Sequence, residues 1–373
     1  VDVRGELSDP LPGIENIRLR AGYTDYRHDE RDQGVVSTTF TNEGYDGRVE
    51  VQHKPFAGFK GVVGLQLSKS DFAAVGEESF LAPSTTKNTG LFVMEEYELG
   101  DWHLEGALRQ EWQEASALGL ADTEHKPFSI SGSAVWHFMP GWTGAVSLSR
   151  SQRAPSAQEL YADGVHLATN TYEMGDAGLD VETANALELT LRKTAGSTTA
   201  SVSAYHYIYD DYIFARTLDQ FEDFRLIQYS QADATFTGVE GEVRQQLTPW
   251  LSATVFGDYV RGELKGGGGA LPRIPAARVG VRAEAFSGPW SGDVEYSRTF
   301  KQNDIAAFER ETPGYNMVNA TVAYDVELAG VKSQVFLRGT NLLDELALNH
   351  ASFLAETAPQ RGRNLVVGVR ARF

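Results

Sequence analysis

The last segment of the chain, LVVGVRARF at residues 365–373, alternates between apolar and polar positions. Successive side chains of a β-strand point to opposite faces, so this segment has two distinct faces. One face is wholly apolar, and the other carries Arg370 and Arg372. An apolar face toward lipid and a polar face toward a water-filled interior are typical of a membrane β-barrel. The edge of a soluble β-sandwich also shows this pattern.

The same alternation, interrupted by turn residues, predicts 17 strands along the chain. Short connections alternate regularly with long ones such as 73–86, 151–182 and 343–361. Outer-membrane barrels have this asymmetry, because tight turns lie on the periplasmic side and long loops lie outside. The predicted strands are 1–8, 16–27, 43–53, 58–72, 87–99, 101–114, 126–138, 141–150, 183–194, 197–213, 234–247, 250–263, 275–287, 289–301, 315–327, 331–342 and 362–373.

Tryptophans gather beside the predicted short turns. Trp102, Trp142, Trp250 and Trp290 closely follow such turns, and Trp136 precedes one. This placement indicates an aromatic girdle at one membrane face. A strand of ten residues rises about 33 Å, or about 23 Å when tilted, which matches the apolar band of about 25 Å in such barrels. The pattern therefore predicts an all-β fold, a transmembrane antiparallel up-and-down β-barrel.

Composition supports this class of protein. The 373 residues are 42% hydrophobic, include no cysteine and carry a formal net charge of -18. No segment approaches the roughly 18 consecutive apolar residues of a transmembrane helix, so membrane insertion requires a closed barrel. The lack of cysteine excludes disulfides and thiolate chemistry. The acidic balance disfavours nucleic acid as a partner and concentrates cations.

An odd number of strands is unusual, because bacterial single-chain barrels have even numbers. Counting back from the long final connection, we expect about 17 strands of a roughly 22-stranded barrel, the size class whose lumen holds a plug. Residues 1–373 then form a single barrel domain that lacks an N-terminal plug and about five strands. A smaller barrel with one miscounted strand is the alternative. The chain opens on VDVRGELS, which reads as a strand and not as a signal peptide.

Four segments resemble the TonB-dependent outer-membrane receptors. They are SRSQRAPSAQELYADG (149–164), MGDAGLDVETANALELTL (174–191), TPGYNMVNATVAY (312–324) and LRGTNLLDE (337–345), together with the terminal Phe373. The resemblance implies energised uptake of a scarce nutrient across the bacterial outer membrane, and no enzymatic activity. It also implies a TonB-type energy-coupling protein as partner, acting through a plug and TonB box that this chain lacks. Phe373 resembles the outer-membrane assembly signal read by the barrel-assembly machinery.

Finer resemblance points to the zinc-uptake (ZnuD-like) branch. The segments that carry it are AQELYADGVHLATNTYEMGD (157–176), LPRIPAARVG (271–280) and HASFLAETAPQRGR (350–363). This branch implies Zn²⁺ as the transported ligand, no permanently bound cofactor, and a monomer surrounded by outer-membrane lipid. A haem or siderophore receptor of the same fold is the alternative, with haem as its ligand. Gln152, where haem receptors have phenylalanine, argues against haem.

Candidate zinc ligands lie in the long connections. His166 lies between Asp163 and Glu173, and neutral imidazole with carboxylates suits zinc. A solvated loop cluster is the alternative reading of the same residues. The resemblance favours a ligand role for His166, and Glu78 and His350 in other external connections are further candidates.

Sequence patterns of catalysis are lacking. The chain contains no HExxH, no Gly-x-Ser-x-Gly and no Walker loop. A barrel hydrolase and a passive porin remain less favoured alternatives, because Ser, His, Asp and Glu are abundant but no spacing singles out a set.

Overall fold

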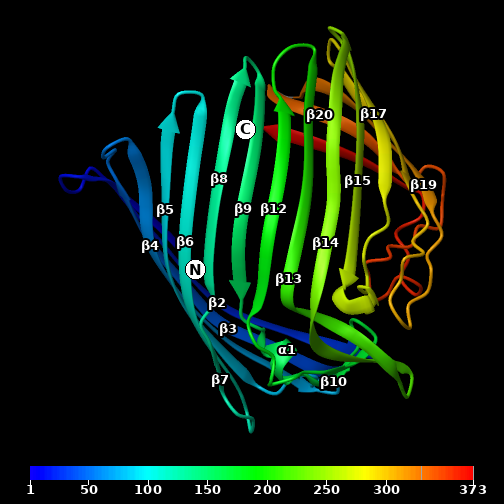
Figure 1. Cartoon of the computed structure of the whole chain (residues 1–373). Helices are drawn as coiled ribbons and strands as arrows, with labels where there is room; N and C mark the ends of the chain where they lie inside the picture. Colours follow the sequence, from blue (N-terminus) through cyan, green and yellow to red (C-terminus); the bar gives the residue numbers. More distant parts are fainter. Residues whose placement is uncertain (329, 373) are drawn as a thin grey trace.

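The computed structural model describes residues 1–328 and 330–372, and it consists of one large curled β-sheet (Figure 1). Four of its 21 strands are short pieces within connections, and the other 17 form a continuous wall. The number of wall strands therefore agrees with the alternation pattern of the sequence. The wall strands are β1 (Asp2–Ser8), β2 (Ile14–Asp32), β3 (Val35–His53), β4 (Phe59–Gly76), β5 (Ser84–Leu99), β6 (Trp102–Ala117), β8 (Phe128–Met139), β9 (Trp142–Arg153), β12 (Glu182–Lys193), β13 (Thr198–Phe221), β14 (Phe224–Thr248), β15 (Leu251–Leu264), β17 (Arg278–Ser287), β18 (Trp290–Thr299), β19 (Tyr315–Leu328), β20 (Val331–Thr340) and β21 (Asn364–Arg372).

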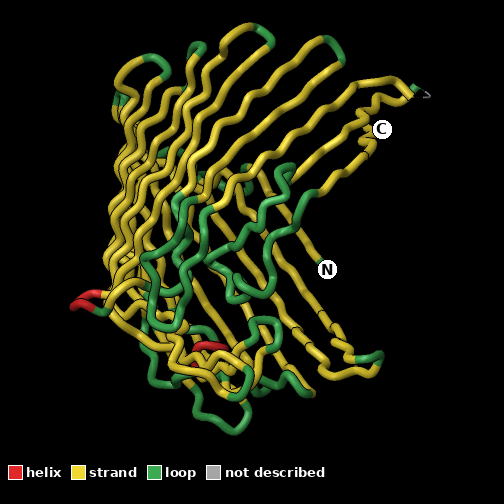
Figure 2. Tube along the Cα trace, turned by 90° about the vertical axis from the view of Figure 1, so that its right-hand side faces the viewer, coloured by secondary structure: helices red, strands yellow, loops and turns green. Residues whose placement is uncertain are grey.

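Each wall strand pairs antiparallel with the next wall strand along the chain. This up-and-down order confirms the predicted fold class. Within the described residues β1 and β21 each pair on one side only, and Figure 2 shows the sheet curling between them. The expectation of about five further strands and a plug stays a prediction.

The connections differ strongly between the two ends of the wall. Short turns join β5 to β6, β8 to β9, and β12 to β13 at the upper end in Figure 1. The lower end carries the long connections and their small elements. These elements are β7 (Thr123–His125), α1 (Ala157–Tyr161), β10 (Asp163–His166), β11 (Thr171–Met174), η1 (Lys265–Gly267) and β16 (Gly269–Ala270). None of the described helices is long and apolar enough to cross a membrane.

Two connections that we expected to be loops are strands instead. Residues 28–42 and 214–233 extend the β2–β3 and β13–β14 hairpins well beyond their neighbours. The first hairpin turns on Gln33 and Gly34, whose φ angles of 47° and 88° suit a tight two-residue turn. Backbone pairing continues to such a turn whatever the side chains, so the polar residues of these segments concealed the strands.

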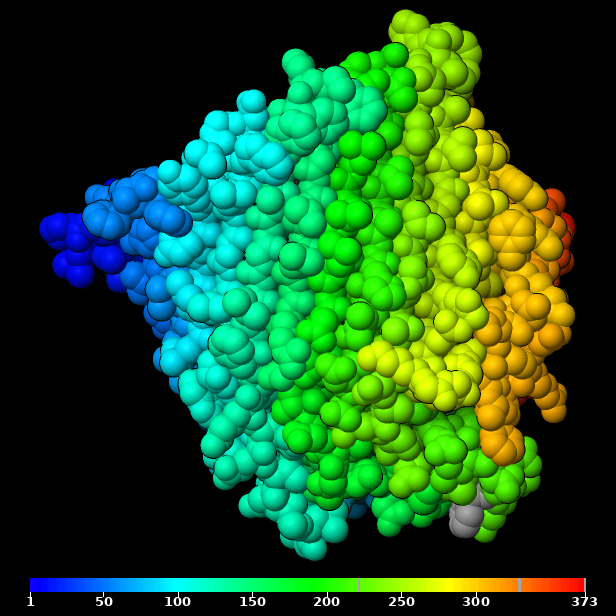
Figure 3. Space-filling model, in the orientation of Figure 1, coloured from blue at the N-terminus to red at the C-terminus, as the bar shows by residue number. Residues whose placement is uncertain are grey.

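The outer face of the wall is apolar, which inverts the usual arrangement of a soluble protein. In β12, exposed leucines alternate with Glu188, Thr190 and Arg192 on the inner face. Figure 3 shows this outer surface continuing in chain order across the wall. Exposed apolar residues of the wall include Leu65, Leu91, Leu108, Leu148, Leu187, Leu189, Leu191, Val239, Val255, Val281, Val294, Val322, Leu337, Val367 and Val369.

Tryptophans mark the short-turn end of this apolar face. Trp102 and Trp136 lie opposite each other on β6 and β8 and stack with ring centroids 5.3 Å apart. Trp250 and Trp290 are more than half exposed, at 53% and 54%. Large aromatic rings exposed in a band are costly in water and favourable at a membrane interface, so the predicted girdle has its structural basis here.

Aromatic rings on the inner face fill the space above glycines of the neighbouring strand. Phe256 lies opposite Gly280, and a Cβ at that glycine would stand 2.3 Å from the ring. The same pairing joins Phe92 to Gly64 and Phe336 to Gly368. A ring lying over a glycine restores the packing that the missing side chain leaves out and fixes the strand register.

We predict that Leu189→Arg destabilises the protein in a lipid bilayer by about 2–4 kcal/mol, because it places a charge on the lipid-facing side near the middle of a strand. Thr190→Arg is the matched control, since the neighbouring side chain faces the interior. Chemical unfolding in lipid bilayers measures both variants. Equal losses would contradict the assignment of the two faces.

We also predict that Gly280→Ala lowers the free energy of unfolding by about 1–3 kcal/mol, because the added methyl group clashes with Phe256. Gly47→Ala is the control, since nothing lies within 4 Å of its added Cβ. Chemical unfolding in detergent measures the change. In a Phe256→Ala background the Gly280→Ala cost should largely disappear, and a persistent cost would contradict the packing argument.

Candidate functional site

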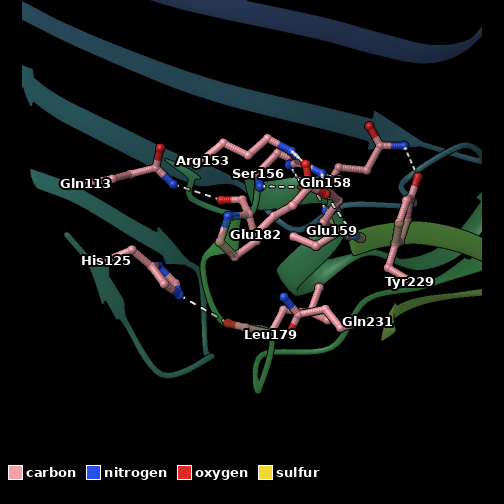
Figure 4. Close-up of polar contacts among 12 residues, drawn as sticks. Gln113, His125, Arg153, Ser156, Gln158, Glu159, Leu179, Glu182, Tyr229 and Gln231 are labelled. Atoms are coloured by element: carbon pink, nitrogen blue, oxygen red, sulfur yellow. Dashed lines mark hydrogen bonds and ion pairs between the residues drawn. The ribbon is translucent and has the colours of Figure 1, made fainter. Parts of the chain in front are cut away.

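The longest connection, between β9 and β12, folds into a compact unit over the loop end of the wall. The Ser156 side chain accepts the Glu159 backbone N–H, and the Glu159 carboxylate accepts the Ser156 N–H, which forms a capping box on α1. Arg153 donates to Glu159 and to Glu182 of β12 (Figure 4). The Arg-Ala-Pro and Glu-Leu-Tyr residues noted in the sequence therefore anchor this connection to the wall.

A small apolar core holds the connection in place. Leu160 and Tyr161 of α1 pack with Phe80 and Ala115, which belong to other parts of the chain. The Tyr161 hydroxyl donates to the Ala115 carbonyl at 2.9 Å. The side chain of His125 is buried near this core, and its Nε2 lies 3.1 Å from the Leu179 carbonyl oxygen (Figure 4). These contacts give the loop region a fixed framework.

The hairpin of β10 and β11 carries the central histidine. His166 pairs with Thr171, and Gly164 pairs with Glu173, so the side chains of His166 and Glu173 share one face. Strand β11 also pairs in parallel with the extended part of β14. The unexpected length of the β13–β14 hairpin thus provides the platform on which this site is built.

Glu173 is buried and accepts hydrogen bonds from all sides. Its Oε1 lies 2.8 Å from His166 Nδ1 and accepts from the Thr171 hydroxyl at 3.0 Å. Its Oε2 accepts from Gln158 Nε2 at 2.7 Å and from the Tyr229 hydroxyl at 3.0 Å. A carboxylate with this many donors stays ionised and holds the imidazole in one orientation.

Glu78 faces the other nitrogen of the same ring. Its Oε1 lies 3.9 Å from His166 Nε2 and accepts the Ala168 backbone N–H at 3.2 Å. The Glu78 backbone N–H donates to the Thr38 hydroxyl at 3.0 Å, which fixes the loop against β3. The side chain is only 1% exposed, and its Oε2 has no hydrogen-bond donor within the described residues, because the Glu30 side chain that adjoins this carboxyl group is itself a carboxyl. A buried oxygen without a partner is costly, so it marks a place where a ligand is favourable.

The ring of His166 is held by stacking as well. Phe80 lies parallel to it at 6°, with ring centroids 4.2 Å apart. The imidazole is thus fixed by Phe80 on one face and by Glu173 at Nδ1. Its Nε2 remains directed toward Glu78.

The electrostatics of the three side chains are coupled. Burial acts to lower the pKa of His166, but the hydrogen bond and charge of Glu173 and the charge of Glu78 outweigh it and raise that pKa above its usual value. Burial acts to raise the pKa of Glu173, but hydrogen bonds from His166 and Gln158 lower it to about 2. Burial, followed by the neighbouring carboxyl of Glu30, raises the pKa of Glu78.

The structure brings together three of the residues that we singled out from the sequence: His166, Glu173 and Glu78. The two carboxylates lie at opposite nitrogens of the His166 ring, so the three side chains do not point toward one common position. Accordingly, no three His, Asp or Glu side chains of residues 1–328 and 330–372 form a ready-made metal site. Ion binding here requires Glu78 to move closer to Nε2.

Asp163, His350 and Phe373 lie elsewhere. Asp163 is three residues from His166 and so points to the opposite face of β10, where it accepts from the Tyr172 hydroxyl at 3.0 Å. His350 is buried in another set of contacts, with its Nε2 3.7 Å from Glu309 and its Nδ1 3.2 Å from the Thr312 hydroxyl. Phe373 lies outside the described residues.

Sequence reasoning missed the neighbours that complete the site. Glu30 was assigned to a loop and overlooked, although it lies on β2 close to Glu78. Phe80, Gln158 and Tyr229 have ordinary sequence contexts, and only the folded connection brings them to the histidine. The alternation in HDE (28–30) was the one local signal, because it puts His28 and Glu30 on one strand face.

The chain matches a known family over most of its length. A family model described as "TonB dependent receptor-like, beta-barrel" matches residues 4–342.

Several solved structures share the architecture. The copper transporter OprC has a TM-score of 0.85 and 18% identity, over 99% of this chain and 64% of that protein. The FrpB iron transporter from Neisseria meningitidis (F3-3 variant) has a TM-score of 0.75 and 15% identity, over 99% and 62%. The unliganded ferric citrate transporter FecA has a TM-score of 0.72 and 15% identity, over 100% and 61%. These identities establish similarity of fold alone, and the chain spans between 61% and 64% of the length of these proteins.

The ion pair of His166 and Glu173 predicts a pH dependence in the metal-free protein. Because the pKa of His166 is raised, the pair stabilises the hairpin fully below the ordinary histidine pKa, and this contribution is lost as pH rises through the raised value. Glu173, with a pKa of about 2, stays ionised throughout. Hydrogen exchange of the β10–β11 amides, corrected for its intrinsic pH dependence, should accelerate across that step. His166→Gln should abolish the step, and an unchanged step in this variant would contradict the assignment.

Proposed function

The chain belongs to the family of TonB-dependent receptor-like β-barrels, and on that premise we propose that it is the wall of an outer-membrane receptor for energised metal uptake, with zinc as the transported ion. The apolar outer face and the tryptophan band support placement in the outer membrane. The long connections at one end provide the capture surface. The role is transport and not catalysis.

The observation that best supports zinc as the transported ion is the arrangement of Glu78 and His166. Two ligands of a tetrahedral zinc ion, at about 2.0–2.2 Å each, stand about 3.4 Å apart. The 3.9 Å between Glu78 Oε1 and His166 Nε2 therefore closes to that distance with a shift of about 0.5 Å. Such a shift lies within the movement of one side chain, and the ion offsets the charge of a buried carboxylate whose Oε2 has no hydrogen-bond partner within the described residues.

Charge supports the same conclusion. Glu78 and Glu173 are each 1% exposed, so two carboxylates are buried around one imidazole. Even a protonated His166 leaves this group negative if both carboxylates are ionised, and uncompensated buried charge is strongly unfavourable. A divalent cation at Nε2 offsets it. Metal then replaces the proton on Nε2, while Glu173 keeps the proton on Nδ1.

Glu173 supports an orienting role better than direct ligation. Both of its oxygens are already occupied by hydrogen bonds, including the one to His166 Nδ1. Metal-bound histidines commonly donate their second N–H to such a carboxylate, which fixes the ring and makes it a better ligand. Direct ligation by Glu173, Asp163 or His350 stays a prediction.

The geometry favours a bare ion over haem. An axial histidine needs its free nitrogen open to a large planar ligand. In this chain the His166 side chain is only 20% exposed, and its Nε2 faces a buried carboxylate. A siderophore receptor, in contrast, does not need His166. Whether ligand binding depends on His166 therefore distinguishes a zinc receptor from a siderophore receptor.

The partners that we propose follow from the family. They are outer-membrane lipid around the wall, a TonB-type energy-coupling protein acting through a plug, and the barrel-assembly machinery during insertion. In this account the loops capture the ion, and movement of a plug releases it inward. The barrel wall acts as a scaffold for both steps, and we expect a monomer.

We predict saturable Zn²⁺ binding by the intact protein in detergent, measured against a competing chromophoric chelator. His166→Ala should abolish it, and Glu173→Gln should weaken it about 10–100-fold, because the ring loses its orienting partner. His206→Ala is the control, since that histidine lies on the wall strand β13 and its Nδ1 contacts Thr237. Binding that is equal in the His166→Ala variant and the unmutated protein would overturn the zinc proposal and favour a chelated-metal ligand.

A further inference from the structure

Beyond the residues already assigned to the zinc site, a second histidine and a further carboxylate adjoin it from β2. Glu30 pairs with Thr38 of β3, and the Thr38 hydroxyl accepts the Glu78 backbone N–H at 3.0 Å. Cross-strand partners place their side chains on the same face of a sheet. The carboxyl of Glu30 lies within hydrogen-bond reach of that of Glu78, and Thr38 is their common neighbour.

His28 lies on the same face of β2, two residues before Glu30. Its Nε2 is 4.0 Å from Glu30 Oε1. Its Nδ1 is a buried atom with no hydrogen-bond partner among the described residues. Glu30 thus stands between two imidazoles, with His28 on one side and the Glu78–His166 pair on the other.

The two histidines lie at opposite ends of one row of aromatic rings. His28 lies parallel to Phe40 at 4°, with centroids 4.7 Å apart, just as Phe80 lies parallel to His166. Phe72 lies between these two stacked pairs with its ring tilted to both, its centroid 6.4 Å from that of Phe40 and 6.4 Å from that of Phe80. Stacked rings with fixed planes lose little freedom when they bind a ligand, so both imidazoles are preorganised.

Exposure falls along this series of ligands. The side chains of His28 and Glu30 are each 41% exposed, that of His166 is 20% exposed and that of Glu78 is 1% exposed. An incoming ion meets the partly hydrated pair first. The 4.0 Å between its two ligand atoms resembles the 3.9 Å at the inner pair. The Glu78 oxygen without a partner lies at the inner end.

We propose that His28 and Glu30 form an outer binding station for a divalent cation, from which the ion passes to Glu78 and His166 with Glu30 as the shared ligand. This inference rests on the proposed function, since it extends the same site. At the outer station the ion keeps part of its water shell. Transfer exchanges the His28 imidazole for that of His166, while the Glu30 carboxylate stays bound. No step requires the ion to be without a protein ligand.

The test is a Zn²⁺ titration of the intact protein in detergent, followed to more than one equivalent with the same chelator. We expect a tight event and a weaker one. His28→Ala should remove the weaker event and leave the tight affinity unchanged. His166→Ala should remove the tight event and leave the weaker one. Glu30→Gln should remove the weaker event and also weaken the tight one by about tenfold or more, because its carboxylate serves both stations.

Asp29→Asn is the matched control. It removes the same charge from the adjacent position, but Asp29 is on the opposite face and accepts from the Thr39 hydroxyl. If Asp29→Asn acts like Glu30→Gln, the effect is one of general charge and the outer station is overturned.

The remaining outcomes separate the two proposals. A single tight event that needs His166 but is unaffected by His28→Ala and Glu30→Gln would overturn the outer station and leave the zinc site standing. The absence of any event that needs His166 would overturn the zinc site itself, and the transfer path with it.

Discussion

The structure depends on one constraint: every backbone N–H and C=O within the wall must find its partner on a neighbouring strand. Antiparallel pairing from β1 to β21 meets that requirement and forces side chains to alternate between two faces. Leucine and valine therefore occupy the outside, and charged residues together with the aromatic–glycine pairs occupy the inside. The same pairing continues past the wall in the β2–β3 and β13–β14 hairpins, and these two extensions carry the candidate site.

Alternation made the wall predictable from sequence, since apolar residues recur at every second position of a strand with one apolar face. The number of wall strands, the order of turns and the tryptophan band all followed from this signal. The two extended hairpins did not, because polar and apolar residues are mixed in their outer parts without a sustained apolar face. As a result, the sequence did not predict Glu30 of the β2–β3 hairpin as a site residue, nor the pairing of β11 with the extended part of β14.

The site itself was only partly readable for the same reason. The candidates included His166, Glu173 and Glu78, because imidazole and carboxylates suit zinc. Which of them can bind the ion and which orients the ring depends on the register of the β10–β11 hairpin inside a loop. That register puts Glu173 at Nδ1 and turns Asp163 away. Glu78 reaches Nε2 from about ninety residues earlier in the chain, a separation over which sequence spacing carries no information.

The most direct test of the central claim, that a divalent cation binds between Glu78 and His166, is a crystal structure of the intact protein with Zn²⁺. Anomalous difference maps recorded above and below the zinc absorption edge locate the ion without reference to the protein coordinates. The account predicts a peak within bonding distance of His166 Nε2 and a Glu78 carboxylate oxygen, with Glu173 still bound to Nδ1. A peak at other residues, with His166 and Glu78 in their present positions, would contradict it.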